Sequence, residues 1–232
     1  MGRVSRRIAV DDYEEDLREK EEAIKNTFKP LNASQASFIE YIKHADISFG
    51  IGPAGTGKTF VAVACALQYL AMNKYRRLIL VRPIVEADEH LGFLPGTINE
   101  KVDPYFRPIF DALHDLVGTE KTQLMITSKQ VEIAPLAYMR GRTLNDSIII
   151  LDEAQNTTVS QMKMFLTRLG RNSKVIVTGD VSQNDLPKGK LSGLTDAMNR
   201  LDGISEIKIS KFKKEDVVRH PLVKLIVEAY ED

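Results

Sequence analysis

The residues from Gly52 to Thr59 carry the clearest chemical signal in the sequence. They read Gly-Pro-Ala-Gly-Thr-Gly-Lys-Thr and match the phosphate-binding pattern Gly-x-x-x-x-Gly-Lys-Thr. Glycines let the backbone curl so that N–H groups point at anionic oxygens, and a following helix adds its positive N-terminal end. Lys58 is expected to reach the β- and γ-phosphates of a nucleoside triphosphate, and Thr59 to coordinate Mg²⁺. The predicted nucleotide-binding residues of this loop are Gly52, Pro53, Ala54, Gly55, Thr56, Gly57, Lys58 and Thr59.

Two adjacent carboxylates give a second signal. An apolar strand candidate over residues 147–152 ends in Asp152, and Glu153 follows it directly. Ligands bind at the carboxyl ends of strands in open α/β sheets. We therefore predict that Asp152 holds Mg²⁺ opposite Thr59 and that Glu153 orients and deprotonates the attacking water. This order favours hydrolysis over phosphorylation of a small molecule, because a kinase needs a base aimed at a substrate hydroxyl.

Two glutamines stand close to predicted strand ends. Gln183 follows the strand candidate 174–179, and Gln155 lies two residues after Glu153. A polar amide beyond a strand can sense the γ-phosphate and pass the difference to a moving loop. Gln183 is the candidate sensor, and Gln155 is a second candidate at the nucleotide. The alternative is that both amides cap turns.

These motifs require a scaffold in which several strands end at one edge of a sheet. From residue 31 onward the pattern alternates between strands and helices, which predicts an α/β fold with a mostly parallel, doubly wound sheet in a single domain over 31–232. The strand candidates are 46–51, 77–82, 147–152 and 174–179, with weaker ones at 130–133 and 206–209. The helix candidates are 34–43, 58–72, 98–117, 158–169, 191–201 and 220–230.

Residues 1–30 differ from the rest in composition. Residues 11–22 include eight acidic side chains, several of them spaced to pair with a basic residue one helical turn away. We interpret this segment either as an exposed helix that could bind a partner or as a charged, partly disordered leader.

Charge and composition exclude several classes of protein. Lys plus Arg and Asp plus Glu each number 32, so nucleic-acid binding would need a local basic patch. The single cysteine, Cys65, lies in an apolar helix candidate and is expected to be a reduced, packed thiol in a reducing compartment. The apolar segment 60–72 is shorter than the roughly 20 residues of a membrane span. We therefore expect a soluble, cytoplasmic protein.

Several stretches of the chain match a single family pattern. They are Gly52–Thr59, Val81-Arg82-Pro83, Leu91-Gly92-Phe93-Leu94-Pro95-Gly96, Lys101-Val102-Asp103-Pro104-Tyr105, Leu151-Asp152-Glu153-Ala154-Gln155-Asn156, Phe165-Leu166-Thr167-Arg168, Thr178-Gly179-Asp180 and Asp216-Val217-Val218-Arg219-His220. Together they resemble the PhoH family, which are phosphate-starvation-inducible-type ATPases of bacteria and their phages. The resemblance covers roughly residues 31–231. It implies a RecA-like P-loop domain related to the first motor domain of superfamily 1 helicases, ATP hydrolysis and, in some members, RNA unwinding.

The superfamily 1 resemblance assigns roles to two further residues. The segment Leu31-Asn32-Ala33-Ser34-Gln35 resembles the one whose glutamine recognises adenine, which implies that Gln35 favours ATP over GTP. A helix that begins at Asn32 or Ser34 explains the same segment, and both interpretations can hold. The strand end around Arg82 resembles a motif that touches single-stranded nucleic acid, so Arg82 is the expected phosphate contact.

Single-stranded RNA or DNA is the predicted macromolecular partner. The basic candidates are Arg82, Lys101, Arg107, Lys188, Lys190, Lys208, Lys211, Lys213 and Lys214. Phe93, Tyr105 and Phe106 are available either for stacking on bases or for packing in a core.

A lone RecA-like module leaves one side of the γ-phosphate open, which predicts a homo-oligomer in the form of a hexameric ring, with an arginine supplied in trans. Arg168 is the first candidate for this arginine, and Arg219 is the second, with action within its own subunit as a further option for Arg219. Either could instead neutralise the carbonyls at a helix end. The predicted function is a Mg²⁺-dependent ATPase that binds, remodels or unwinds single-stranded RNA or DNA. The alternative is a nucleotide-dependent assembly switch that acts on a protein partner without nucleic acid.

Overall fold

The computed structural model describes residues 28–84, 98–187 and 189–218, together with 222 and 226. For residues 98–104 the structure describes the backbone but not the side chains. Most of the predicted leader, Phe93, Lys188, Arg219 and most of the predicted helix 220–230 therefore lie outside the described residues.

A six-stranded sheet forms the centre of the molecule, with its strands in the order β3-β2-β4-β5-β1-β6. The strands are β1 (Ile47–Ile51), β2 (Arg77–Arg82), β3 (Val131–Pro135), β4 (Ser147–Leu151), β5 (Lys174–Gly179) and β6 (Ile207–Lys211). All five strand pairs are parallel. The inner strands β1, β4 and β5 are buried along their whole length, which explains their continuous apolar sequences.

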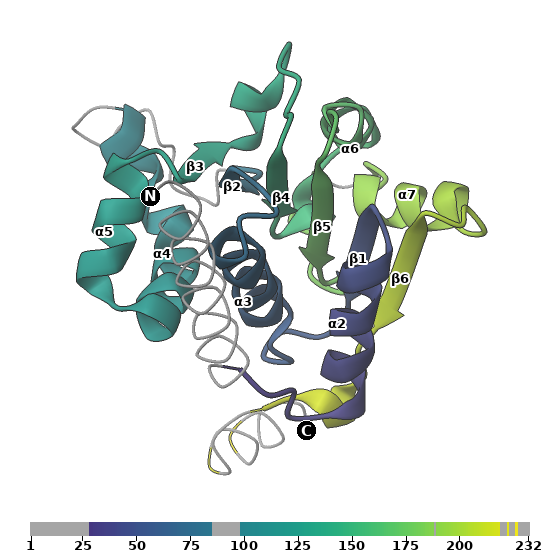
Figure 1. Ribbon diagram of the computed structural model, residues 1–232. Coiled ribbons are helices and arrows are strands. Elements are labelled where there is room, and N and C mark those ends of the chain that lie inside the picture. The colour runs from purple at the N-terminus through teal and green to yellow at the C-terminus, as the bar shows by residue number, and fades with distance from the viewer. Residues whose placement is uncertain (1–27, 85–97, 188, 219–221, 223–225, 227–232) are drawn as a thin grey trace, which may run out of the picture.

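Helices cover both faces of this sheet (Figure 1). One face packs against α2 (Ala33–His44), α3 (Lys58–Ala71), α4 (Ile98–Val117) and α5 (Thr119–Thr127), and the other packs against α6 (Val159–Leu166) and α7 (Gly193–Leu201). The fold is thus the predicted doubly wound α/β class with a parallel sheet. Both weaker strand candidates, at 130–133 and 206–209, form edge strands of the sheet.

Helix α5 and the end of α6 differ from the sequence-based prediction. Helix α5 was not predicted, because only Thr122 and Met125 are buried and the segment therefore lacks an apolar stripe. The predicted helix 158–169 stops at Leu166, where the hydroxyl of Thr167 donates to the carbonyl of Lys163. Short 3₁₀ helices occur at 136–139, 154–156 and 214–216.

Glycine at position 50 lets α2 approach the sheet directly below the phosphate loop. A Cβ atom on Gly50 would lie 2.5 Å from the ring of Phe38, which is fully buried in α2. The ring of Phe38 also contacts Phe212 edge to face. This packing fixes the position of β1 and hence of the loop that follows it.

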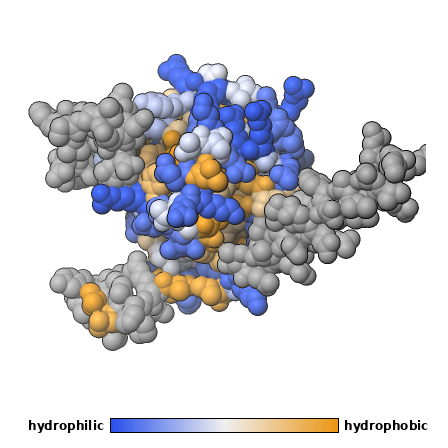
Figure 2. Space-filling view, turned by 60° about the vertical axis from the view of Figure 1, so that its left-hand side comes forward, coloured by the Kyte–Doolittle hydropathy of each residue, from blue (hydrophilic) through white to orange (hydrophobic). Residues whose placement is uncertain are grey.

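Among the described residues, no helix is both long and apolar enough to cross a bilayer. On the face shown in Figure 2, hydrophilic residues dominate the upper part of the described surface, and hydrophobic ones gather in smaller patches at its middle and lower part. Such a mixture is ordinary for the surface of a globular domain.

Candidate nucleotide site

Three neighbouring strands deliver the predicted chemical groups to one edge of the sheet. The phosphate loop follows β1, Asp152 follows β4, and Asp180 follows β5, which lies between the other two strands. Because the strands are parallel, their carboxyl ends meet at this edge. A cavity of about 230 Å³ opens there. Its lining residues are Ala54, Gly55, Gly57, Lys58, Thr59, Phe60, Asp152, Glu153, Gly179, Asp180 and Gln183.

The phosphate loop leads directly into α3. Gly55 and Gly57 adopt positive φ angles of 79° and 80°, a left-handed conformation that residues with a side chain rarely adopt. Gly57 is the N-cap of α3, and no described side chain caps this helix end. The N-terminus of α3 therefore presents backbone N–H groups at the cavity, as an anion site requires.

Lys58 is folded back onto its own loop. Its ammonium donates to the carbonyl of Gly52 at 2.6 Å and to that of Pro53 at 2.7 Å. Burial lowers the pKa of Lys58, and the nearby carboxylates of Asp180, Glu153 and Asp152 oppose this shift. The ammonium lines the cavity, so phosphate oxygens entering there would compete with the two carbonyls.

Two hydroxyls hold the carboxylate of Asp152. The hydroxyls of Thr59 and Thr178 each donate to its Oδ1 at 2.7 Å, and the side chain is only 3% exposed. A hydroxyl and a carboxylate are the hard oxygen ligands that Mg²⁺ prefers, so Thr59 and Asp152 fit the predicted metal. Thr178 was not predicted as a site residue, although it begins the Thr178-Gly179-Asp180 motif.

Both carboxylate oxygens of Glu153 have partners in this structure. The guanidinium of Arg82 donates to Oε1 at 3.0 Å, and the side-chain amide of Gln155 donates to Oε2. The backbone of Glu153 is left-handed, with φ of 53°, which is unusual for a residue other than glycine. The candidate base is thus held in one orientation by residues of two separate chain segments.

Gln155 and Asp180 connect Glu153 to the phosphate loop. The side-chain oxygen of Gln155 accepts from the backbone N–H of Asp180 at 3.0 Å. The carboxylate of Asp180 in turn accepts from the backbone N–H of Ala54 at 3.1 Å and from Ser182. Asp180 was not among the predicted site residues, although the same short motif contains it. The sequence signal for a site role was its place directly after a buried strand.

The remaining predicted glutamines occupy different environments. Gln183 is exposed and lines the cavity. Gln35 is 2% exposed, donates to the carbonyl of Thr56 at 3.0 Å and accepts from the N–H of Leu31 at 2.9 Å. Gln35 thus holds the phosphate loop at Thr56 and does not line the cavity. Its predicted contact with adenine stays a prediction. Asn32 caps α2 by accepting from the N–H of Gln35, as the helix-start interpretation expected.

Arg168 lies just beyond the end of α6. Its guanidinium donates to the carbonyls of Met164 and Arg142 at 3.0 and 3.1 Å. These contacts agree with the helix-end alternative within one chain, and the role in trans stays a prediction. Arg219 lies outside the described residues. Its neighbour Val218 donates its backbone N–H to the carbonyl of Gly55 in the phosphate loop at 2.9 Å.

The predicted nucleic-acid residues divide into core and surface. Phe106 is 2% exposed and packs in the core, so it is not available for stacking on a base. Tyr105 is half-buried, and its carbonyl accepts from Arg82. The exposed basic candidates are Arg107, Lys190, Lys208, Lys211, Lys213 and Lys214.

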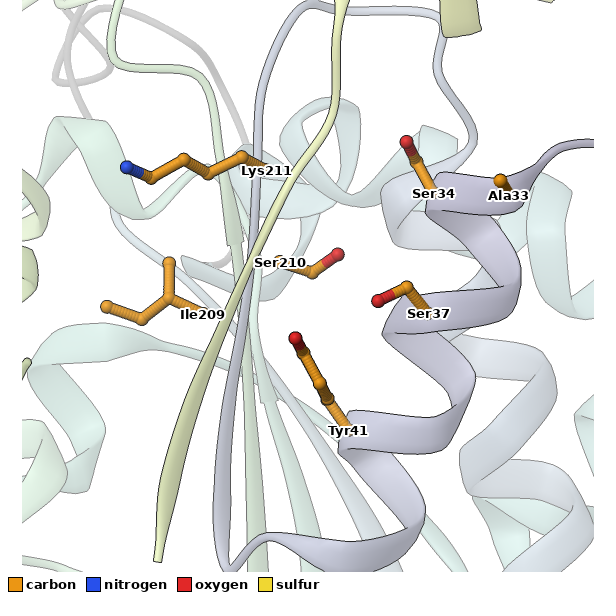
Figure 3. A pocket seen from close by; sticks show the side chains of 7 residues that line it. All are labelled: Ala33, Ser34, Ser37, Tyr41, Ile209, Ser210 and Lys211. Atoms are coloured by element: carbon orange, nitrogen blue, oxygen red, sulfur yellow. The ribbon is translucent and has the colours of Figure 1, made fainter. Parts of the chain in front are cut away.

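A second cavity, of about 210 Å³, lies between α2 and the edge strand β6 (Figure 3). Ser210 points from β6 toward Ser37 of α2, and the hydroxyl of Tyr41 points toward the same space, whereas the side chain of Lys211 turns away. Within the described part of the chain, these three hydroxyls have no hydrogen-bond partner. We call this cavity the α2–β6 groove.

A family model described as "PhoH-like protein" matches residues 27–231. The "PhoH-like protein" of Bacillus subtilis (strain 168) is 54% identical over 219 residues, which are 94% of this chain and 68% of that protein. "Protein PhoH" of Escherichia coli (strain K12) is 47% identical over 201 residues, covering 86% of this chain and 57% of that protein. The "PhoH-like protein" of Mycobacterium tuberculosis (strain ATCC 25618 / H37Rv) is 55% identical and is covered over 58% of its length. The chain thus spans somewhat more than half of the length of these relatives.

Solved structures of lower similarity include a helicase domain and an ATPase core. The Pyrococcus furiosus Hef helicase domain matches with a TM-score of 0.45 and 17% identity, covering 79% of this chain and 38% of that one. The Sulfolobus solfataricus SWI2/SNF2 ATPase core, solved with double-stranded DNA, matches with a TM-score of 0.40 and 13% identity, covering 66% of this chain and 34% of that one. Both likenesses are partial, and neither bears on the activity of this chain.

Proposed function

Because the chain belongs to the PhoH-like protein family, we propose that it is a Mg²⁺-dependent ATPase that couples hydrolysis to binding, remodelling or unwinding of single-stranded RNA or DNA. The general element of this function is a P-loop site for a nucleoside triphosphate. The observation that carries the proposal is the convergence of Lys58, Thr59, Asp152 and Glu153 on one cavity at the ends of parallel strands.

Each of these residues has a defined task in the proposed reaction. The N-terminus of α3 and Lys58 bind the triphosphate, while Thr59 and Asp152 provide oxygen ligands for Mg²⁺. A Mg²⁺ ion held by these two residues would supply positive charge against the negative charge that develops on the phosphates. Glu153 takes the proton of the attacking water, which makes it the general base.

Arg82 supports the nucleic-acid half of the proposal. It lies at the carboxyl end of β2, next to the end of β4, and its guanidinium is 3.0 Å from Glu153. Exposed lysines on β6 and after it supply further positive charge for a phosphate backbone. We place this activity in the cytoplasm.

A homo-oligomeric ring remains part of the proposal. Arg219 is the preferred arginine for completing the site within its own subunit, because its neighbour Val218 contacts the phosphate loop of the same chain. Arg168, which is engaged at the end of α6 within the chain, stays the candidate for a contact in trans. Mass measurements in solution, with and without ATP, test for the ring.

The deciding experiment is an ATPase assay of the purified chain with Mg²⁺, in the presence and absence of poly-uridine and single-stranded DNA. We expect hydrolysis that Lys58→Ala abolishes, stimulation by at least one polymer, and polymer binding that weakens as salt rises. Hydrolysis without stimulation or binding, together with an ATP-dependent change in mass, would favour the assembly switch. Failure to bind any nucleotide would refute both functions.

A further inference from the structure

The ion pair between Arg82 and Glu153 joins two predicted functions that the sequence left separate. Arg82 is the expected nucleic-acid contact, and Glu153 is the expected base of hydrolysis. They are 71 positions apart in the sequence, yet a guanidinium nitrogen of Arg82 lies 3.0 Å from a carboxylate oxygen of Glu153. The pair is partly shielded, with 16% of the Arg82 side chain and 35% of the Glu153 side chain exposed.

The surroundings hold both partners in place. Arg82 also donates to the carbonyl of Tyr105 in α4, and the second oxygen of Glu153 accepts from Gln155. Gln155 is fixed by the backbone N–H of Asp180. Glu153 lines the cavity, and any rotation of its carboxylate there breaks the contact with Arg82 or the one with Gln155.

We infer that Arg82 is a positioning residue that restrains Glu153 and releases it when a nucleic-acid phosphate binds the guanidinium. This inference rests on the proposed function and adds a route by which nucleic acid could stimulate hydrolysis. A phosphate oxygen is an anionic acceptor like the carboxylate oxygen of Glu153, so it competes with Glu153 for the guanidinium nitrogen that donates to it.

Steady-state ATPase kinetics of the unmodified protein and of two Arg82 variants, with and without poly-uridine, test this inference. Arg82→Ala is expected to raise the basal kcat about fivefold, the scale of a partly exposed ion pair, with little change in KM for ATP. Poly-uridine should then give no further stimulation. Arg82→Lys retains the charge but lacks the planar fork, so its basal rate should fall between those of Arg82→Ala and the unmodified protein.

Arg77→Ala is the matched control. Arg77 lies at the other end of β2 and pairs with Glu132 at 3.6 Å, far along the strand from the nucleotide cavity. Its basal rate and stimulation should equal those of the unmodified protein. A basal kcat in Arg82→Ala at or below the unmodified value would overturn the inference while leaving the proposed ATPase intact, whereas absence of hydrolysis in the unmodified protein would sink the proposed function itself.

Hydrogen exchange on the unmodified protein supplies a measurement that does not depend on any variant folding. Two hydrogen bonds close the 3₁₀ turn after Glu153. The N–H of Asn156 donates to the carbonyl of Glu153 at 3.0 Å, and the N–H of Thr157 donates to the carbonyl of Ala154 at 3.1 Å. Release of Glu153 should speed exchange at these amides when poly-uridine is added. Unchanged exchange at a polymer concentration that saturates binding would contradict the inference.

Discussion

The nucleotide cavity and the α2–β6 groove are similar in volume, about 230 and 210 Å³, but they differ in chemistry. The nucleotide cavity contains a buried ammonium and three carboxylates, each held by a named partner. The groove contains hydroxyls that have no partner among the described residues, and its lysine turns away. Because the two cavities are similar in size, the network of held charges is the feature that distinguishes the proposed site of chemistry from the groove.

Lys58→Ala should produce the largest effect. Removing the ammonium takes away a positive charge that no other described residue of the cavity lining supplies. We expect turnover to fall by at least about 100-fold, as for loss of a preorganised transition-state donor. A phosphate-release assay measures this, and Lys43→Ala, an exposed lysine on α2, is the control. Turnover close to normal would mean that the nucleotide cavity is not the site of hydrolysis.

Glu153→Gln should separate binding from hydrolysis. The amide keeps the size of the side chain but cannot accept a proton, so kcat should fall by a factor of about 10² to 10⁴. Calorimetry should show ATP binding within a few-fold of normal. Undiminished kcat would mean that another group activates the water.

Asp180→Asn should have an intermediate effect. The amide of asparagine can still accept from the backbone N–H of Ala54, but the hydrogen bond loses its charge assistance. Loss of about 1.5 kcal/mol in loop positioning corresponds to a roughly tenfold fall in kcat/KM for ATP. Asp196→Asn is the control, because Asp196 is an acidic residue of α7 that pairs with Arg200 away from the cavity. Equal kinetics in the two variants would show that the contact of Asp180 with the loop is not needed.

Variants in the α2–β6 groove should have the smallest effect. Ser37→Ala and Ser210→Ala remove hydroxyls without a described partner, so kcat/KM for ATP should stay within about twofold of normal and unfolding free energy within about 0.5 kcal/mol. Steady-state kinetics and urea unfolding check both values. A large loss of ATPase activity in either variant would show that the contrast between the two cavities is wrong.

Local sequence patterns predicted most of the fold. The apolar strand of β4 and the glycine-rich loop before α3 are each short, continuous signals, and all six predicted strands form. Helix α5 was missed because its burial depends on packing against α4 and β3, and not on a periodic apolar stripe of its own. The early end of α6 escaped prediction for a related reason, because the hydroxyl of Thr167 binds a carbonyl of the last turn.

By itself, the sequence determined the phosphate loop, the acidic pair at Asp152 and the parallel sheet that presents them, because each depends on neighbouring residues in the chain. Only the tertiary structure decided that Arg82 meets Glu153 and that Asp180 holds the loop at Ala54, across separations of 71 and 126 residues. Such contacts depend on the order of strands in the sheet, which places distant chain segments side by side. Proximity across β2, β4, β5 and β1, and not any local pattern, therefore sets how Glu153, the proposed base, is held.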